Sequence, residues 1–325
     1  MEIKEIHTFL KGDLEQVEAQ IAASLKSDVA LLESLNKSLR ERPGKMLRSM
    51  LALLMAGALG KVNDSTVRYA AAIELLHNAT LFHDDVVDGA TLRRGRPTVA
   101  ALLNPPAAVL IGDFWLVRCV SLVLEARVEP EKVLRRFAAT LSHLAEGELR
   151  QMELAGLGTT TREDYFRIVY GKTASLFVTA AVSAAISVQA PEPLCKAAET
   201  FAARLGTAFQ IKDDIFDYAS DAALGKPAGI DLREQKITLP LLCALESVSE
   251  SEEKAVREKV ARISERPELE AEVRAFVKEH DGVGRATEVM NRYLDQALEC
   301  LEAFPPSARK DYLTALTHYV GDRQI

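Results

Sequence analysis

Asp84-Asp85-Val86-Val87-Asp88, echoed by Asp213-Asp214-Ile215-Phe216-Asp217, is the stretch that decides the fold of this chain. Both triplets of carboxylates stand in apolar surroundings with helical spacing. Successive helical residues are 100° apart, so the first and last Asp of each triplet share one helix face, a turn apart. We therefore expect two helices that each present a pair of carboxylates.

Carboxylates in these positions destabilise a helix unless they bind a ligand. Asp is a poor helix former, and like charges at i,i+4 repel by about a few tenths of a kcal/mol. Gly89 and the polar stretch Ala219-Ser220-Asp221 suggest that both triplets lie near helix C-termini, where the helix dipole disfavours anions. Cations that prefer oxygen ligands, such as Mg²⁺, would turn this cost into a binding site.

Helical periodicity extends outward from the triplets through nearly the whole chain, without convincing strand alternation. Gly and Pro, at Pro43-Gly44, Pro105-Pro106 and Pro191, divide it into helix-sized segments. The polar stretch 220–235 is expected to be a loop and not a domain linker. Hydrophobic residues make up 48% of the chain, enough for a substantial core. The sequence predicts an all-α bundle in a single domain spanning residues 1–325.

Composition excludes several classes of protein. The net charge of −7 argues against a nucleic-acid partner. The start of the chain, Met1 to Ile6, lacks the apolar core of a signal peptide. The uncharged stretch from Thr173 to Pro191 is rich in Ser, Thr and Ala, so we expect a buried helix and no transmembrane segment. The scattered cysteines predict a reducing, cytoplasmic setting with neither a zinc site nor a disulfide framework; they are Cys119, Cys195, Cys243 and Cys300.

Polar residues continue both carboxylate faces along their helices. One stripe comprises His77, Thr80, Asp84 and Asp88, and the other comprises Gln210, Asp213 and Asp217. His83 is expected to be a packed or hydrogen-bonding residue instead. Basic residues occur before and after the triplets: Lys45, Arg48, Arg93, Arg94, Lys172, Lys226 and Lys236. Each alone is explained as surface charge, but as a set they indicate a clamp for two diphosphates.

The chemistry that this set predicts is ionisation of a diphosphate. Cations and basic side chains stabilise the charge that develops on a diphosphate leaving group. Apolar surroundings keep water from a reactive carbocation. The sequence shows no Ser or Cys nucleophile with a partner base, no Walker lysine loop and no GxGxxG after a strand.

These residues resemble the trans-type isoprenyl diphosphate synthases, also called polyprenyl synthetases, over essentially the whole chain. The matching segments are Gly44 to Arg48, Glu74 to Asp88, Leu92 to Thr98, Gly112-Asp113, Gly147 to Gln151, Gly171-Lys172-Thr173, Phe209 to Asp217, Leu224 to Pro227 and Lys236 to Pro240. Two departures are visible. The usual Gly-Gly-Lys-Arg-x-Arg-Pro is here Pro43 to Ser49, which puts the start of that helix in question, and Lys212 matches no known role.

The resemblance implies a helical bundle around a central cavity, in a homodimer, that joins isopentenyl diphosphate to an allylic diphosphate. It implies three Mg²⁺ ions held by Asp84, Asp85, Asp88, Asp213 and Asp217, with Asp84, Asp88 and Asp213 as direct ligands; these three and Lys172 would be catalytic. The allylic substrate would be held by Arg93, Lys172, Thr173, Gln210, Lys226 and Lys236. Isopentenyl diphosphate would be held by Lys45, Arg48, His77 and Arg94. The departing diphosphate would act as the base.

Product length in this family depends on the residues four and five positions before the first triplet, here Thr80 and Ala79. They lie roughly 5–8 Å below Asp84 along the helix axis. Short-chain enzymes often place an aromatic ring here, so Ala79 and Thr80 predict an open tunnel and a long product, roughly C30–C50. The alternative is that both residues simply pack against a neighbouring helix.

Other functions remain as alternatives. A short-chain synthase that makes farnesyl or geranylgeranyl diphosphate shares the same motifs. A class I terpene cyclase shares the first triplet but normally has a different second site. A non-catalytic subunit typically loses a triplet or the clamp, and a plain cation-binding helical protein would not need the basic residues.

Overall fold

Helices make up 79% of this computed structural model, which describes residues 3–40, 44–93, 95–218 and 229–323. Within these residues the strands are β1 (Leu92–Arg93) and β2 (Arg96–Pro97), which pair antiparallel. The all-α prediction is confirmed. The sequence analysis found no strand alternation here, because a two-residue ladder is too short to produce it.

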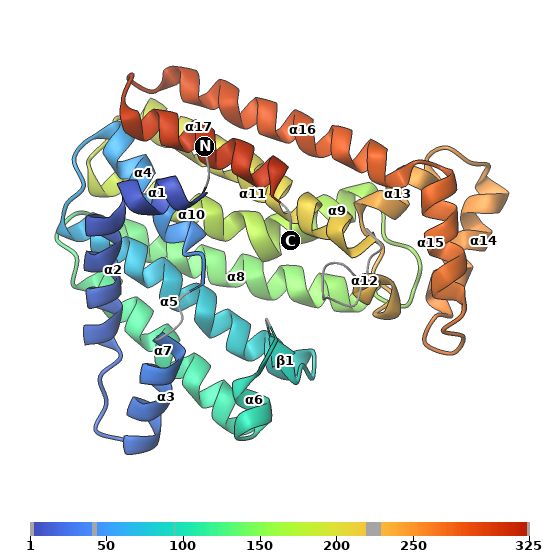
Figure 1. The fold of residues 1–325 in the computed structure, drawn as a ribbon, viewed down its shortest axis with the longest axis horizontal. Coiled ribbons are helices and arrows are strands. Elements are labelled where there is room, and N and C mark those ends of the chain that lie inside the picture. The colour runs from blue at the N-terminus through green and yellow to red at the C-terminus, as the bar shows by residue number, and fades with distance from the viewer. Residues whose placement is uncertain (1–2, 41–43, 94, 219–228, 324–325) are drawn as a thin grey trace. The chain divides into compact units, whose positions relative to one another are not determined.

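The contacts between residues divide the chain into two compact units. Figure 1 shows the chain coloured by residue number. Unit 1 comprises Met1–Ala138, Thr179–Glu199 and Ala303–Leu313. Unit 2 comprises Ala139–Val178, Thr200–Glu302 and Thr314–Ile325. The single domain over residues 1–325 stays a prediction.

Unit 1 is built around α5 (Asp64–Val87), which ends at the first triplet. It also holds α1 (Ile3–Phe9), α2 (Lys11–Ser24), α3 (Ala30–Arg40), α4 (Leu47–Leu59), α6 (Val99–Leu102), α7 (Pro105–Leu124), and parts of α8 (Pro130–Leu154), α10 (Ser175–Ser187), α11 (Glu192–Tyr218) and α17 (Ala308–Asp322). The Asn63 side chain and Thr66 form a capping box that starts α5. Helices α2, α4 and α7 pack against α5 and bury its apolar side chains, which holds the triplet on a rigid element (Figure 1).

Unit 2 holds the second triplet, at the end of α11. It contains the rest of α8, α10, α11 and α17, together with α9 (Arg162–Val169), the π-helix η1 (Tyr170–Ala174), α12 (Ile230–Arg233), α13 (Leu239–Leu245), α14 (Glu250–Ala261), α15 (Leu269–Glu279), α16 (Gly282–Cys300) and the 3₁₀-helix η2 (Leu301–Ala303). Helix α13 is entirely buried and packs against α16. The π-helix continues α9 directly and carries Lys172 and Thr173.

Two helical stretches have the length and apolar composition of a membrane span. Arg162–Ser187, with a mean hydropathy of 1.3, is 89% buried within the protein. The predicted buried helix after Thr173 is thus confirmed up to Ser187, where α10 ends. Pro105–Leu124 is more apolar, with a mean hydropathy of 2.0, and only 39% buried. Helix α7 therefore exposes an apolar face that the sequence analysis missed.

Candidate active site

The first triplet lies at the C-terminus of α5, as predicted. The helix ends at Val87, Asp88 is its C-cap, and Gly89 follows with a φ of 61°. Asp84 is half-buried and Asp88 is exposed, so both carboxylates are accessible to a ligand. Their amide and carbonyl groups are joined by the last helical hydrogen bond, Asp88 N to Asp84 O at 2.8 Å.

Asp85 has different surroundings from its two companions. It is buried, and its Oδ1 accepts a hydrogen bond from Arg93 Nε at 2.7 Å. Arg93 is in β1, and the loop that carries it is closed by Thr98, whose hydroxyl donates to the Ala90 carbonyl at 2.8 Å. Asp85 therefore holds a clamp residue in place. Its predicted role as a metal ligand stays a prediction.

The other predicted site residues of α5 precede the triplet; they are His77, Ala79 and Thr80. His77 and Thr80 are half-buried, and the Thr80 hydroxyl donates to the His77 carbonyl at 2.9 Å. Ala79 is buried and presents only a methyl group. The His83 ring lies against α7, with Nε2 3.3 Å from the Val109 carbonyl, which confirms its expected packing role.

The start of α4 differs from the expected helix. The helix begins at Leu47, so Arg48 lies in its first turn, whereas Lys45 precedes the helix and is exposed. Met46 adopts a left-handed conformation with a φ of 46°. The sequence analysis left the start of this helix in question, and the structure places it at Leu47, after Lys45.

The second triplet lies at the C-terminus of α11, and the structure gives its first carboxylate a basic partner. Arg323 Nη2 donates to Asp213 Oδ1 at 2.7 Å and to the Phe209 carbonyl at 2.9 Å. The guanidinium also lies over the Phe209 ring, 3.9 Å from its centroid. Lys212, to which we assigned no role, lies over the Phe216 ring, and burial lowers its pKa.

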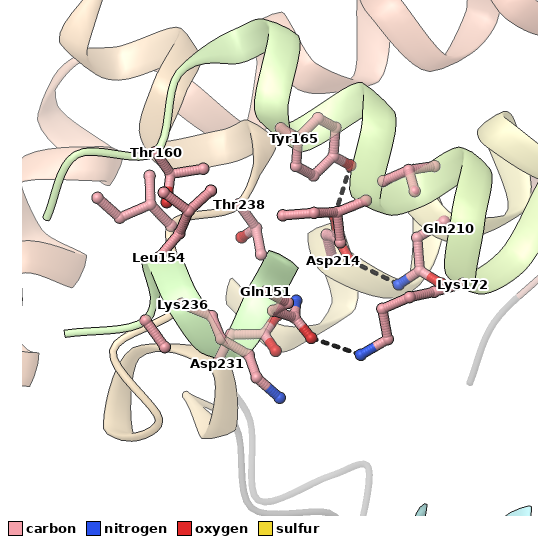
Figure 2. Close-up of a pocket in the computed structure, with 14 residues that line it drawn as sticks. Gln151, Leu154, Thr160, Tyr165, Lys172, Gln210, Asp214, Asp231, Lys236 and Thr238 are labelled. Atoms are coloured by element: carbon pink, nitrogen blue, oxygen red, sulfur yellow. Dashed lines mark hydrogen bonds between the residues drawn. The ribbon is translucent and has the colours of Figure 1, made fainter. Parts of the chain in front are cut away.

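Asp214, the middle carboxylate, is buried in a hydrogen-bonded group shown in Figure 2. Tyr165 Oη donates to Asp214 Oδ2 at 2.5 Å, and Gln210 Nε2 donates to Oδ1 at 2.8 Å. The Thr173 hydroxyl donates to Gln210 Oε1 at 2.5 Å. Burial raises the pKa of Asp214 and that of Tyr165 well above their usual values.

Asp217, the last carboxylate, binds the backbone at the start of α12, a helix that lies within the stretch 220–235 expected to be a loop. Its Oδ1 accepts from the Ile230 amide and its Oδ2 from the Asp231 amide, each at 3.0 Å. Burial raises the pKa of Asp217, although these amide bonds oppose the shift. Asp231 lies next to it, and burial followed by the negative charge of Asp217 raises the pKa of Asp231 to about 7.

Lys172 and Lys236 line one pocket with Gln210, Asp214, Asp231 and Tyr165 (Figure 2). Lys172 Nζ is 2.5 Å from Glu148 Oε2 and also donates to Gln151. The Lys236 side chain pairs with Glu234. Of the predicted allylic clamp, the structure thus brings Lys172, Gln210 and Lys236 to one pocket of unit 2, where Thr173 donates to Gln210 without lining the pocket, while Arg93 belongs to unit 1. Arg94 and Lys226 lie outside the described residues.

The donors present fit a hard, oxygen-binding cation. Asp84, Asp88 and Asp213 offer accessible carboxylates, which are the ligands that Mg²⁺ prefers. Among residues 3–40, 44–93, 95–218 and 229–323, no group of three or more His, Cys, Asp or Glu side chains could hold a metal ion. Mg²⁺ usually takes one or two carboxylates and completes its octahedron with substrate phosphates and water, so this donor set suits it.

Comparison with known proteins identifies the family of this chain. The family model for polyprenyl synthetase matches residues 29–279. The chain belongs to this family. As a polyprenyl synthetase, it is 36% identical to the octaprenyl diphosphate synthase of Haemophilus influenzae, over 99% of this chain and 98% of that relative.

Solved polyprenyl synthetases share the fold. A decaprenyl diphosphate synthase from Rhodobacter capsulatus superposes with a TM-score of 0.91 and 32% identity, covering 99% of each chain. A polyprenyl synthase from Caulobacter crescentus, complexed with calcium and isoprenyl diphosphate, gives a TM-score of 0.90 and 31% identity, covering 100% of this chain and 98% of that one.

Sequence reasoning missed several residues of this polyprenyl synthetase site. Arg323 stands near the C-terminus without any helical or motif signal that links it to Asp213. Tyr165 lies on the apolar face of a short helix, a position that predicts only that its side chain is buried. Of these residues, Glu148 could have been found from the sequence, because it lies in the segment Gly147 to Gln151 that carries the family resemblance.

Proposed function

We propose that this polyprenyl synthetase is an all-trans long-chain polyprenyl diphosphate synthase, which adds isopentenyl diphosphate units to an allylic diphosphate until the product reaches roughly C30–C50. The observation that carries this proposal is the similarity to octaprenyl and decaprenyl diphosphate synthases along nearly the full chain. The presence of both triplets, whose outer carboxylates are half-buried or exposed, and of most of the clamp supports a catalytic chain and not an inactive subunit.

The basic residues bind the two diphosphates. We assign Lys172, Gln210 and Lys236, which line the pocket of unit 2, to the allylic diphosphate. Thr173, which donates to Gln210, and Arg93 of unit 1, which Asp85 fixes, are assigned to it by family resemblance. Lys45, Arg48 and His77 would bind isopentenyl diphosphate. Arg94 and Lys226 complete the two sets by family resemblance. Arg can bind phosphate through two parallel hydrogen bonds and Lys through a compact charge.

Asp84, Asp88 and Asp213 would hold Mg²⁺, three ions per site by family resemblance. When bound, Mg²⁺ supplies positive charge that stabilises the departing diphosphate. The similar polyprenyl synthase from Caulobacter crescentus, complexed with calcium and isoprenyl diphosphate, supports a divalent cation at this site. Lys172 adds a fixed positive charge for the same leaving group.

The reaction needs dry, apolar walls beside the clamp. The allylic carbon–oxygen bond breaks, the isopentenyl double bond forms the new carbon–carbon bond, and the departing diphosphate takes the proton that is lost. Buried apolar side chains of α5, including Leu76, Ala79 and Phe82, exclude water from the growing chain. Because Ala79 presents a methyl group and Thr80 is small, neither blocks a long product.

A homodimer and a cytoplasmic location complete the proposal. On α7, Leu110, Val117 and Leu124 are exposed and follow one another at intervals of seven residues, so they share one apolar face. A second copy of this chain would cover that face. The four cysteines are all free of disulfides, which fits a reducing cytoplasm.

The proposed reaction class is tested by incubating the purified protein alone with Mg²⁺, isopentenyl diphosphate and an allylic primer. We expect release of inorganic diphosphate that depends on both substrates and on Mg²⁺, and that falls at least about a hundredfold in Asp84→Asn. Diphosphate release from the allylic substrate without isopentenyl diphosphate would instead favour a cyclase. Activity that appears only with a second protein would favour a subunit of a heteromeric enzyme.

A further inference from the structure

In both triplets the middle Asp is the buried one. Asp85 is 3% exposed and Asp214 is 4% exposed, whereas their companions are half-buried or exposed. The reason is helical geometry, since each middle residue points 100° away from its neighbours and into its own unit. A carboxylate is costly to bury unless it accepts hydrogen bonds, so the partners of these two groups show what each one does.

Asp214 receives its bonds from two different helices. Tyr165 of α9 donates to one carboxylate oxygen at 2.5 Å, and Gln210 of α11 donates to the other at 2.8 Å (Figure 2). Tyr165 is itself 3% exposed, so water does not compete for its hydroxyl. Bonds to a carboxylate are shorter and stronger than bonds between neutral groups.

The bonds to Asp214 determine how Gln210 is oriented. Gln210 Nε2 donates to Asp214 Oδ1, so its NH₂ group is turned toward Asp214 and its Oε1 away. Oε1 then accepts from the Thr173 hydroxyl at 2.5 Å. A continuous chain of hydrogen bonds thus runs from Tyr165 through Asp214 and Gln210 to Thr173, and it joins α9, α11 and the π-helix.

Tyr165 is held firmly at the far end of this chain. It lies in the first turn of α9, which a capping box of Thr161 and Asp164 fixes. The Phe166 ring meets its ring edge-on, with centroids 5.2 Å apart. Tyr165 therefore provides a rigid reference point for Asp214, while Thr173 at the other end bonds to Gln210, which lines the pocket with Lys172 and Lys236.

We propose that Tyr165 is a positioning residue of this enzyme, whose buried hydroxyl fixes Asp214 and thereby orients Gln210 and Thr173 to bind the allylic diphosphate. This inference rests on the proposed function, because it assigns Gln210 and Thr173 to that substrate. It also gives Asp214 a task other than metal binding.

The test is Tyr165→Phe, which removes the hydroxyl and keeps the ring. We expect the KM for the allylic diphosphate to rise about tenfold, with the KM for isopentenyl diphosphate unchanged, as fits the loss of one buried hydrogen bond. Calorimetric titration with inorganic diphosphate and Mg²⁺, which needs no turnover, should show binding weakened by a similar factor.

The matched control is Tyr69→Phe. Tyr69 is also buried, at 1% exposure, and its hydroxyl donates to the Val128 carbonyl in unit 1, away from the pocket. We expect a lower melting temperature in this variant and unchanged KM values. If Tyr165→Phe likewise changes only the melting temperature, Tyr165 is merely structural and the proposal is wrong.

A double variant separates the hydrogen-bonded chain from a general disturbance of the pocket. If Tyr165 acts through Thr173, then Tyr165→Phe combined with Thr173→Ala should lose less affinity than the product of the two single losses. Independent, multiplicative losses would contradict the chain. If the wild-type protein makes no prenyl product at all, the proposed function fails, yet the diphosphate titration still tests whether Tyr165 supports an anion site.

Discussion

Asp84 and Asp85 are adjacent on α5, yet their surroundings assign them different tasks. Asp84 is half-buried and accessible to a ligand, whereas Asp85 is buried with Arg93 Nε at 2.7 Å from its Oδ1. The helix turns the two side chains 100° apart, so one faces the ligand and the other faces the protein. The same division separates Asp213 from Asp214 on α11.

Asp85→Asn distinguishes a metal ligand from an anchor for Arg93. Removing the charge weakens one charge-assisted hydrogen bond, worth about 1.5–3 kcal/mol, so we expect kcat/KM for the allylic substrate to fall about 10- to 100-fold. Because the defect lies in Arg93, excess Mg²⁺ should not restore the rate, whereas it should partly restore Asp88→Asn. Steady-state kinetics over a range of Mg²⁺ concentrations decide this, and rescue of Asp85→Asn by Mg²⁺ would assign Asp85 to the metal.

Asp231 makes the stability of the apo protein depend on pH. Its folded-state pKa is raised from 3.8 to about 7, chiefly by burial. The folded state therefore holds this proton more tightly than the unfolded state, so its contribution to stability is complete below pH 4 and is lost as the pH rises towards 7. The substitution Asp231→Asn removes this loss of stability with rising pH. Without Mg²⁺, the melting temperature of the variant relative to wild type should increase between pH 5 and 7.5; a constant difference would contradict the shifted pKa.

At the scale of elements, the ends of α5 and α11 could be predicted because Gly89 and the polar stretch after Tyr218 stop the apolar periodicity. Other features could not. Neither the left-handed conformation of Met46 nor the π-helix at Lys172 has a local signal in the sequence, and the π-helix lies where Gly171 is close to the backbone of α8. The bonds of Asp217 to the amides of α12 join residues that are distant in sequence, which periodicity does not report.

Gly171 is where the π-helix meets α8. A Cβ at this position would lie 2.6 Å from the His143 carbonyl and 3.1 Å from the Gly147 Cα, and both are backbone atoms that cannot move cheaply. Gly171→Ala should therefore lower the free energy of unfolding by about 1–3 kcal/mol. It should also reduce activity by displacing Lys172.

Gly12 of α2 provides the matched control, because a Cβ there meets nothing within 4 Å. Gly12→Ala should stabilise the protein by up to about 1 kcal/mol, since alanine loses less backbone entropy in a helix. Urea denaturation of both variants measures the two effects. Equal stability of Gly171→Ala and wild type would show that the contact with α8 can relax.

At the scale of the whole molecule, helix α7 presents an exposed apolar face. Leu110 is 68% exposed and Val117 is 60% exposed, on a helix of which only 39% is buried. An exposed apolar face of this kind marks an interaction site in a folded protein. A second copy of the chain is the occupant that the family resemblance indicates.

Leu110→Glu tests the dimer, because it places a charge at the most exposed of the three residues that define this face. We expect a shift from dimer to monomer in sedimentation velocity, with the helical circular dichroism unchanged. Leu31→Glu, at a residue that is 57% exposed on α3, is the control and should leave the dimer intact. A wild-type protein that sediments as a monomer would refute the proposed role of α7.

The most direct test of the central claim is the length of the product. Purified protein is incubated with Mg²⁺, isopentenyl diphosphate and farnesyl diphosphate, and the products are sized by mass spectrometry. The account predicts a series that ends at C30 or beyond, and a shorter series from Ala79→Phe, whose ring would stand where Ala79 presents only a methyl group. A wild-type series that stops at C20 would contradict the long-chain assignment.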